Sequence, residues 1–265
     1  MISKRNILVI LSLALGLTSC YLSETKTPLV PEGKRNFAVD AYFGFGEKAE
    51  LTLYESNSLS DYVHFFLLWD ASVKVSNGRD TVRMSNLLYT NSKTKRVVNY
   101  VADLDIREGD SLALSVLTPT GETLSAGTKT VSVVKIESAG LGQQTISVET
   151  RNSSNYEENY YLLEVSYFDT DTVRSDWSYH YDMSEDRAEK VRFEVDLREE
   201  SNDFDSLFVS LTRMTESGLR FRESLRKASQ ANVDPFNRPE VLEGNISGGV
   251  GIFTYVRNDS RWLYP

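Results

Sequence analysis

Apolar and polar residues alternate along many short stretches of this chain, and a period of two predicts β-strands with one buried face. Clear examples are residues 37–45 and 190–197. Residues 62–69 are apolar almost throughout, which is typical of a strand covered on both faces. Asn77-Gly78 lies between two alternating runs and predicts a hairpin turn, because both residues tolerate a positive φ.

The pattern changes at residues 217–231, where apolar residues recur every three to four positions. Phe221, Leu225 and Ala228 form the expected apolar stripe, and charged residues lie outside it. This spacing predicts one amphipathic helix, for which Ser217 is a suitable N-cap. Strands are expected to resume after the helix and to close the fold.

Many short strands, frequent turns and one late helix favour an all-β fold. We expect two tandem β-sandwich units, immunoglobulin-like or fibronectin-like, with the short amphipathic helix near the C-terminus. The first unit is predicted over residues 37–138 and the second over residues 143–265, with Gly140 and Gly142 at the boundary. A chain of 265 residues is long enough for two such cores.

The first twenty residues follow a different pattern. Lys4 and Arg5 precede a short apolar run that ends in Leu17-Thr18-Ser19-Cys20. The run is shorter than the roughly 18 apolar residues that a spanning helix needs, and it predicts a signal peptide over residues 1–19. The ending resembles a bacterial lipobox, so Cys20 is the expected lipidation site. An ordinary secretory signal with an unrelated cysteine is the alternative.

Residues 20–36 comprise the lipidated cysteine and a polar stretch without any period, which predicts a flexible tether. Pro28 and Pro31 favour extended backbone in this stretch. Cys20 is the only cysteine of the chain, so no disulfide is expected. Membrane attachment is therefore predicted to depend on the acyl chains of Cys20.

The charge balance excludes some partners. The formal net charge is −9 for the full chain, and it becomes about −11 once Lys4 and Arg5 leave with the signal peptide. Proteins that bind nucleic acid or anionic lipid present stripes of Lys and Arg instead. No nucleic-acid partner is therefore predicted.

Candidates for catalysis are few. His64 lies inside an apolar run and is expected to be a core residue, and His180 lies in an aromatic segment. Neither has a partner at metal-binding spacing, so neither a metal site nor a cofactor is predicted. The chain holds 38 Asp and Glu residues, and sequence alone does not say which of them come together. A pair of carboxylates in a surface hydrolase, or a Ser-His-Asp triad, stays open.

Three aromatic residues form the most suggestive group for ligand binding. Trp177, Tyr179 and Tyr181 are spaced by two and share one strand face. If this face is exposed, the rings could stack on sugars or hold a peptide strand. If it is buried, the rings belong to the core, and this is the interpretation that we favour.

The predicted helix offers a second candidate surface. Arg220, Arg222, Arg226 and Lys227 make a local basic patch on an acidic protein, and Arg213 lies just before the helix. The patch could dock an acidic partner, such as a loop of a transporter. The alternative is a solvated helix face without a partner.

The C-terminal sequence carries a family resemblance. Residues 234–239 (DPFNRP) and residues 244–253 (GNISGGVGIF) are similar to the closing segment of a Bacteroidota lipoprotein family labelled domain-of-unknown-function 4249. Residues 158–161 and 109–116 add weaker matches. The glycines of 244–251 are expected to allow tight turns and close backbone approach, with the apolar residues between them anchored in the core.

This resemblance implies an outer-membrane lipoprotein, often encoded beside TonB-dependent transporters, and it implies neither an activity nor catalytic residues. We therefore expect a non-enzymatic binding or accessory module of the cell outer membrane, on either its periplasmic or its outer side. The alternatives are the surface hydrolase and a structural or adhesive subunit with an open sheet edge.

Overall fold

The computed structural model describes residues 36–44, 48–56, 65–92, 94–169, 172–197, 204–233 and 241–265. The predicted signal peptide, the lipidation site Cys20 and the predicted tether up to residue 35 lie outside these residues. So do His64 and the segment 234–239.

Within the described residues the chain is mostly β-structure, with one α-helix and one short 3-10 helix, so the all-β prediction is confirmed. The elements in chain order are β1 (Asn36–Phe43), β2 (Ala49–Ser56), β3 (Phe65–Leu67), β4 (Ser72–Ser76), β5 (Thr81–Arg83), β6 (Ser85–Thr90), β7 (Val97–Ala102), β8 (Ser111–Leu117), β9 (Thr123–Lys129), β10 (Ile136–Leu141), β11 (Thr145–Arg151), η1 (Tyr156–Glu158), β12 (Tyr160–Asp169), β13 (Thr172–Asp182), β14 (Lys190–Asp196), β15 (Ser206–Met214), α2 (Glu216–Val233) and β16 (Val250–Leu263).

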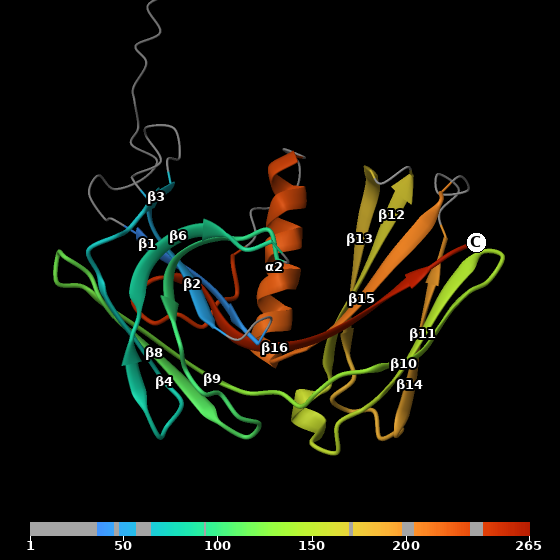
Figure 1. Ribbon diagram of the computed structural model, residues 1–265, viewed down its shortest axis with the longest axis horizontal. Coiled ribbons are helices and arrows are strands. Elements are labelled where there is room, and N and C mark those ends of the chain that lie inside the picture. Colours follow the sequence, from blue (N-terminus) through green and yellow to red (C-terminus); the bar gives the residue numbers. More distant parts are fainter. Residues whose placement is uncertain are drawn as a thin grey trace, which may run out of the picture.

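One long sheet runs through the whole molecule in the order β13-β12-β15-β16-β1-β2-β7-β6, with β3 paired to β2. Its middle strand, β16, belongs to both halves. The first part of β16 pairs in parallel with β1, from Ala38 opposite Val250 onward. The last part pairs antiparallel with β15, up to Leu207 opposite Leu263. Figure 1 shows β16 crossing the lower middle of the molecule between the two halves.

Two smaller sheets cover one face of the long sheet and create two cores. The sheet β5-β4-β8-β9 packs on the first half, and the sheet β10-β11-β14 packs on the second. Side chains such as Leu51 and Val116 fill the first core. Leu163, Val209 and Phe193 fill the second. The result is two sandwiches that share a continuous sheet, and their immunoglobulin-like character stays a prediction.

The connection between the halves lies earlier in the chain than the sequence pattern indicated. β9 ends at Lys129, and residues 130–135, which carry no strand, connect the two halves. Gly140 and Gly142, expected at the boundary, belong to β10 and to the turn into β11. The Gly142 N–H donates to the Thr145 carbonyl at 2.7 Å. These glycines therefore serve a hairpin inside the second half.

Two other strand predictions had different outcomes. The turn at Asn77-Gly78 joins β4 to β5, with Ser76 opposite Thr81 and a φ of 83° at Gly78, so the hairpin is confirmed. The prediction of a strand covered on both faces over residues 62–69 is wrong for the part that the structure describes, which begins at residue 65. There β3 pairs only with β2, and Phe66 is 51% exposed.

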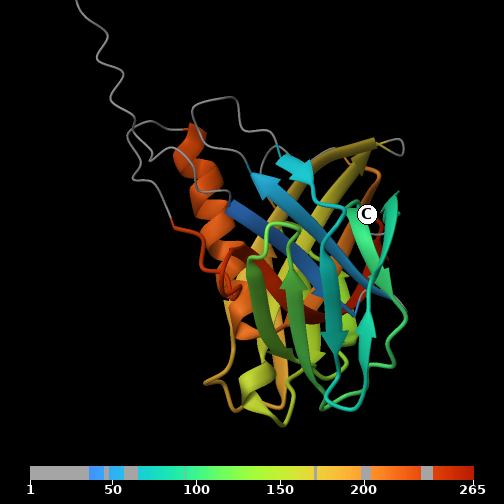
Figure 2. The ribbon, with the colours of Figure 1, turned by 90° about the vertical axis from the view of Figure 1, so that its left-hand side faces the viewer.

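Helix α2 packs on the face of the long sheet that the smaller sheets leave uncovered. Leu219 and Phe221 contact Leu162 and Ile252 of the sheet in a third apolar cluster. In Figure 1 the helix stands between the two halves, and Figure 2 shows it running along one side of the molecule. In the described part of the chain, no helix has both the length and the apolar character needed to cross a membrane.

The helix differs in detail from the predicted one. Thr215 rather than Ser217 caps it, because the Gly218 N–H donates to Thr215 Oγ1 at 3.3 Å. Leu225, expected in the apolar stripe, is 41% exposed, whereas Ser224 is buried. The buried side is turned by a fraction of a helical turn because Gly218 packs against Thr254 of β16. A small residue there lets the backbones approach closely.

The glycine-rich tail behaves as expected. Gly251 has a φ of 110°, and a Cβ at this position would lie 2.0 Å from the Val39 carbonyl oxygen. Only glycine allows β16 to lie this close to β1. Ile252 and Phe253 are fully buried, as predicted, but Val250 is half exposed. The tail therefore locks the shared strand into the first half.

Candidate functional site

Alternate residues of β12, β15 and β16 point to opposite faces of the long sheet. On one face Leu163 of β12 and Leu211 of β15, which are register partners, are completely buried in the second core. On the other face Glu164 and Ser210 are partners, and both are only partly buried. One set of strands therefore has an apolar inner face and a polar outer face.

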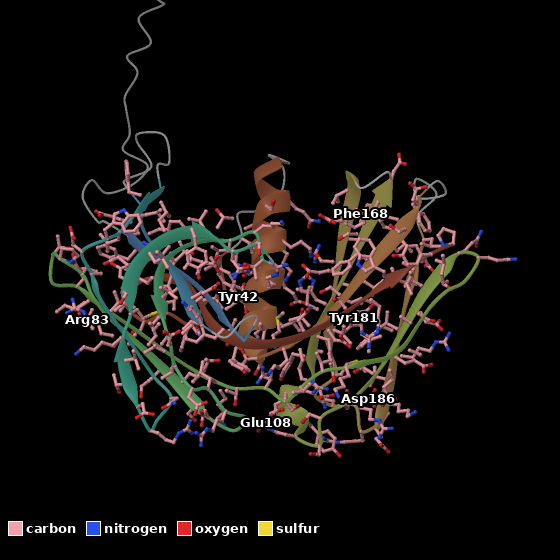
Figure 3. The ribbon with its side chains drawn as sticks, in the orientation of Figure 1. Tyr42, Arg83, Glu108, Phe168, Tyr181 and Asp186 are labelled. Carbon is pink, nitrogen blue, oxygen red and sulfur yellow. The ribbon has the colours of Figure 1, made fainter. Side chains whose placement is uncertain are left out.

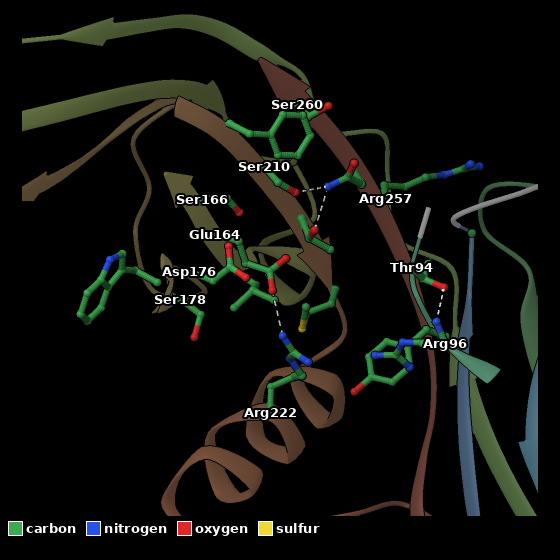
Figure 4. A pocket seen from close by; sticks show the side chains of 18 of the residues that line it. Thr94, Arg96, Glu164, Ser166, Asp176, Ser178, Ser210, Arg222, Arg257 and Ser260 are labelled. Carbon is green, nitrogen blue, oxygen red and sulfur yellow. Dashed lines mark hydrogen bonds and ion pairs between the residues drawn. The ribbon is translucent and has the colours of Figure 1, made fainter. Parts of the chain in front are cut away.

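A groove of about 910 Å³ lies over this outer face, beside α2. Apolar side chains such as Leu162 and Met214 form a large part of its lining, and residues with hydroxyl, amide or carboxylate groups on four strands form another large part. These polar residues are Glu164 and Ser166 of β12, Asp176 and Ser178 of β13, Ser210 and Thr212 of β15, and Asn258 and Ser260 of β16. Figure 4 shows Glu164, Asp176 and Ser210 on the strands beside α2.

Hydrogen bonds order the floor of the groove. Asn258 Nδ2 donates to Ser210 Oγ at 2.7 Å and to Thr212 Oγ1 at 3.0 Å. The Ser210 and Thr212 hydroxyls still have protons that they can donate, and the Asn258 carbonyl oxygen can accept. The floor therefore presents fixed donors and acceptors to the groove.

An ion pair closes the side next to the helix. Arg222 of α2 lies 2.9 Å from a carboxylate oxygen of Glu164. Figure 4 shows Arg222 reaching from the helix toward Glu164, with Asp176 beside it. The pairing of Ser166 with Asp176 and of Glu164 with Ser178 makes the two acids diagonal neighbours on one face. The groove thus holds two carboxylates, one of them bound to an arginine.

The opposite wall comes from the first half of the molecule. Arg96 binds Asp40 at 2.8 Å, and its guanidinium lies 3.5 Å from the centroid of the Tyr42 ring. Burial raises the pKa of Tyr42, and the nearby Arg96 partly opposes this effect. Tyr42 therefore keeps its proton and presents a neutral hydroxyl.

An aromatic cluster of Phe168, Phe208 and Trp262 continues the outer face beyond the hydroxyl groups. The Trp262 ring centroid lies 4.9 Å from that of Phe168 and 5.0 Å from that of Phe208. Phe208 lines the groove, and Trp262 is 46% exposed. Figure 3 places Phe168 near the upper end of the second half. A partly exposed aromatic surface therefore borders the polar groove.

His180 lies opposite Leu162, on the same outer face. Its Nε2 is buried and has no hydrogen-bond partner among the described residues. Burial lowers the pKa of His180 to about 4, and the positive charges of Arg222 and Arg226 add to this effect. The imidazole is therefore neutral at physiological pH.

The aromatic residues singled out from the sequence lie on the other face. Tyr179 pairs with Leu163 and Tyr181 with Tyr161, and the Tyr181 ring centroid is 4.5 Å from that of Phe193. Both tyrosines pack against the second core, as the favoured interpretation predicted. Trp177 packs there too, and it also contributes to the lining of the groove.

The basic residues of the helix are spread over different environments. Arg222 is committed to Glu164, and Arg220 lies 2.6 Å from Glu216, one turn earlier on the helix. Arg226 and Lys227 are exposed. The structure thus brings Arg222 into the groove and leaves the other three on the outer surface of the helix.

Arg213 is not part of this surface, although the sequence placed it there. It is buried in β15, and its guanidinium donates to the Val133 and Arg151 carbonyls at 2.9 and 2.6 Å. It also donates to the Tyr161 hydroxyl at 2.6 Å. Arg213 therefore holds the 130–135 connection against the second half.

Sequence reasoning missed the groove as a site. The available signal is the choice of small polar residues at alternate positions, as in Ser210-Leu211-Thr212 and Asn258-Asp259-Ser260. A plain solvated face would carry more Lys and Glu.

Among the described residues, no group of three or more His, Cys, Asp or Glu side chains could hold a metal ion.

The family model described as domain of unknown function (DUF4249) matches residues 24–261, which is most of the chain. No curated protein matches this chain. The chain therefore belongs to the DUF4249 family, as the resemblance of its C-terminal sequence predicted.

Proposed function

We propose that this chain is a lipid-anchored lipoprotein of the cell outer membrane whose folded part is a binding module, with the groove beside α2 as its binding site. The observation that carries the proposal is the groove itself. Its volume of about 910 Å³ falls within the roughly 300–1,000 Å³ typical of ligand pockets. The groups that line it are fixed by register on four strands.

The anchor is the second part of the proposal. It is supported by the signal-peptide pattern of residues 1–19 and by the lipobox-like ending at Cys20. Two or more acyl chains would hold the protein at the membrane, because each buried methylene contributes about 0.8 kcal/mol. The folded part would then bind its ligand close to the membrane surface.

A transporter of the same membrane, of the TonB-dependent class, is the partner that we propose. Arg226 and Lys227 are exposed on α2, next to the groove, and would dock an acidic loop of such a partner.

The proposal is tested by capture from native envelopes. The full chain carries an affinity tag, is purified in mild detergent, and the molecules that accompany it are identified by mass spectrometry. The same is done with Ser210→Trp, which places an indole on the groove floor. The matched control is Ser115→Trp, because Ser115 is exposed on the outer face of β8.

We expect the wild type and Ser115→Trp to retain the same companion molecules and Ser210→Trp to lose them. If Ser210→Trp retains the full set, the groove is not the binding site. Circular dichroism of each variant confirms that the fold is intact. A charge-reversal pair, Arg226→Glu with Lys227→Glu, is expected to remove a transporter from the captured set selectively.

A surface hydrolase is the second candidate, and one observation favours it. Glu164 and Asp176 are two acids on one concave face, which is the arrangement that glycoside hydrolysis uses. Glu164 is bound to Arg222, so one of the two carboxylates is already engaged. This is the reason that we place binding first.

The hydrolase is tested with Glu164→Gln and Asp176→Asn. If the protein cleaves a glycan or an ester, each variant is expected to lower the rate by at least about 100-fold, the usual contribution of a general acid or base. Binding alone requires no such loss. Activity that survives both substitutions would remove these carboxylates from the mechanism.

A further inference from the structure

We propose that the ligand of the groove is a neutral oligosaccharide, which stacks on the Phe168–Phe208–Trp262 cluster and hydrogen-bonds to the polar floor. This inference rests on the proposed binding function and adds the chemical class of the ligand. It follows from three properties of the groove and its border: an exposed aromatic surface at the border, neutral hydrogen-bonding groups on the floor, and charges that are largely paired.

The aromatic surface suits a sugar ring. The faces of pyranose rings carry C–H groups, whose slight positive charge is attracted to the negative face of an aromatic ring. Trp262 is 46% exposed, and its ring packs against Phe168 and Phe208 on the same face, with centroid distances of 4.9 and 5.0 Å. These contacts restrict the orientations open to the indole before any ligand arrives, which lowers the entropy cost of binding.

The polar floor suits ring hydroxyls. Ser210, Thr212 and Asn258 form one hydrogen-bonded group, and Ser260 follows Asn258 on the same face of β16. Each hydroxyl both donates and accepts, as sugar hydroxyls do. Because Ser260 precedes Trp262 by two residues, the polar floor and the aromatic cluster share one strand face.

The charges of the groove do not favour an ionic ligand. Arg222 binds Glu164, and Arg96 binds Asp40. Of the other two charged residues of the lining, Asp176 and Arg257, one is acidic and one is basic. An anionic or cationic ligand would therefore gain little net Coulomb energy, whereas a neutral ligand that forms hydrogen bonds does not depend on such a gain.

An extended peptide is a less suitable occupant. The floor strands β12, β15 and β16 each have a hydrogen-bonded neighbour on both sides, so their backbone groups are already paired. A peptide that binds by strand addition needs free backbone N–H and C=O groups at a sheet edge, and near the groove β13 presents such an edge on its outer side, away from the floor. This groove instead offers side-chain hydroxyls, an amide and aromatic rings.

The test uses the full chain in detergent and three neutral probes, the linear hexasaccharides of glucose, xylose and mannose. Binding is measured by isothermal titration calorimetry, and stacking by a change in tryptophan fluorescence. We expect at least one probe to bind. Trp262→Leu, which keeps an apolar side chain but removes the ring, is expected to weaken that binding by about tenfold or more.

Two matched variants control the measurement. Trp69→Leu removes a similarly exposed tryptophan from the first half and is expected to leave binding unchanged. Asn258→Ala, on the floor, is expected to weaken binding by about fivefold. The inference is overturned if none of the probes binds, if Trp262→Leu binds as the wild type does, or if a mixture of decapeptides binds in the groove instead.

The outcome also separates this inference from the proposed function. If Ser210→Trp abolishes capture from envelopes while no hexasaccharide binds, the groove is a binding site and the carbohydrate is wrong. If the capture is insensitive to Ser210→Trp and no hexasaccharide binds, both proposals fail.

Discussion

The two faces of β12, β15 and β16 are built from the same strands, and they have opposite surroundings. Leu163, Leu211 and Val209 lie on the inner face and are completely buried against the three-stranded sheet. Their sequence neighbours Glu164, Ser210 and Thr212 line an open groove. The comparison teaches that one strand can supply the packing energy of a core with alternate residues and leave the others available to a ligand.

On each face, one polar side chain lies in surroundings that are unusual for it. Arg213 is a buried cation on the inner face, and five neighbouring oxygens accept its hydrogen bonds. His180 is an imidazole on the outer face whose Nε2 is buried and lacks a partner in the described part of the chain. The following predictions use these two side chains and their neighbours.

The largest effect is expected for Arg213→Met. Removal of the guanidinium leaves buried carbonyl groups without donors, and we expect the free energy of unfolding to fall by roughly 3–5 kcal/mol. Urea unfolding of the full chain measures the change. Arg261→Met, on the neighbouring strand and half exposed, is the control and should cost about 1 kcal/mol or less. Equal losses would contradict the structural role of Arg213.

A sequence-adjacent pair tests the two faces directly. Leu211→Ala is expected to cost roughly 2–5 kcal/mol, because it leaves a cavity in the second core. Ser210→Ala, one residue earlier, is expected to cost about 1 kcal/mol or less, since only the hydrogen bond from Asn258 is lost. The same urea titration measures both. Similar losses would show that the groove face also contributes packing energy.

The partly buried imidazole of His180 is expected to make the stability of the fold depend on pH. Its folded-state pKa of about 4 lies below the ordinary value of 6.5, so the unfolded chain binds the extra proton first. Stability is therefore fully present above pH 6.5 and falls as the pH drops toward 4, by roughly 1–2 kcal/mol after allowance for partial exposure of the ring.

Unfolding experiments at pH 7 and pH 5 check this prediction against the variant His180→Gln. The variant is expected to lose less stability between these two pH values than the wild type does. The comparison between the two proteins removes the contributions of the ionisable groups that they share. An identical pH dependence of wild type and variant would show that His180 is not desolvated as described.

The smallest effect is expected for the Glu164–Arg222 ion pair. Both side chains are partly exposed, so Glu164→Gln should change the free energy of unfolding by about 0.5–1 kcal/mol. Addition of 1 M salt should reduce the difference in the free energy of unfolding between the wild type and the variant, because salt screens this ion pair. A loss of several kcal/mol would mean that α2 depends on this contact for its position.

Much of the fold follows from local pattern, and the sequence therefore reveals it. Alternation in residues 190–197 predicts β14, and the period of three to four in residues 217–231 predicts α2. Both signals are local because they arise from the burial of one face of a single element. The glycines of the tail are readable for the same reason, since Gly251 has a backbone conformation that other residues rarely adopt.

The continuous sheet and the groove cannot be predicted from such local patterns. Whether β16 pairs with β1, β15 or both depends on contacts between residues that are far apart in the chain. The aromatic residues illustrate the difficulty: Trp177, Tyr179 and Tyr181 form the more regular pattern but pack against the second core. Phe208 and Trp262 come from different strands, and only their register brings them together.

The position of β16 also has a consequence for the order of folding. Ala38, near the beginning of β1, has Val250 of β16 as its neighbour in the sheet. The pairing of β1 can therefore be completed only after β16 has been synthesised. Until residues 250–263 are available, β1 and β15 each expose an unpaired edge, and neither half is complete. Non-local pairing of this kind slows folding and makes the two halves reach their native state together.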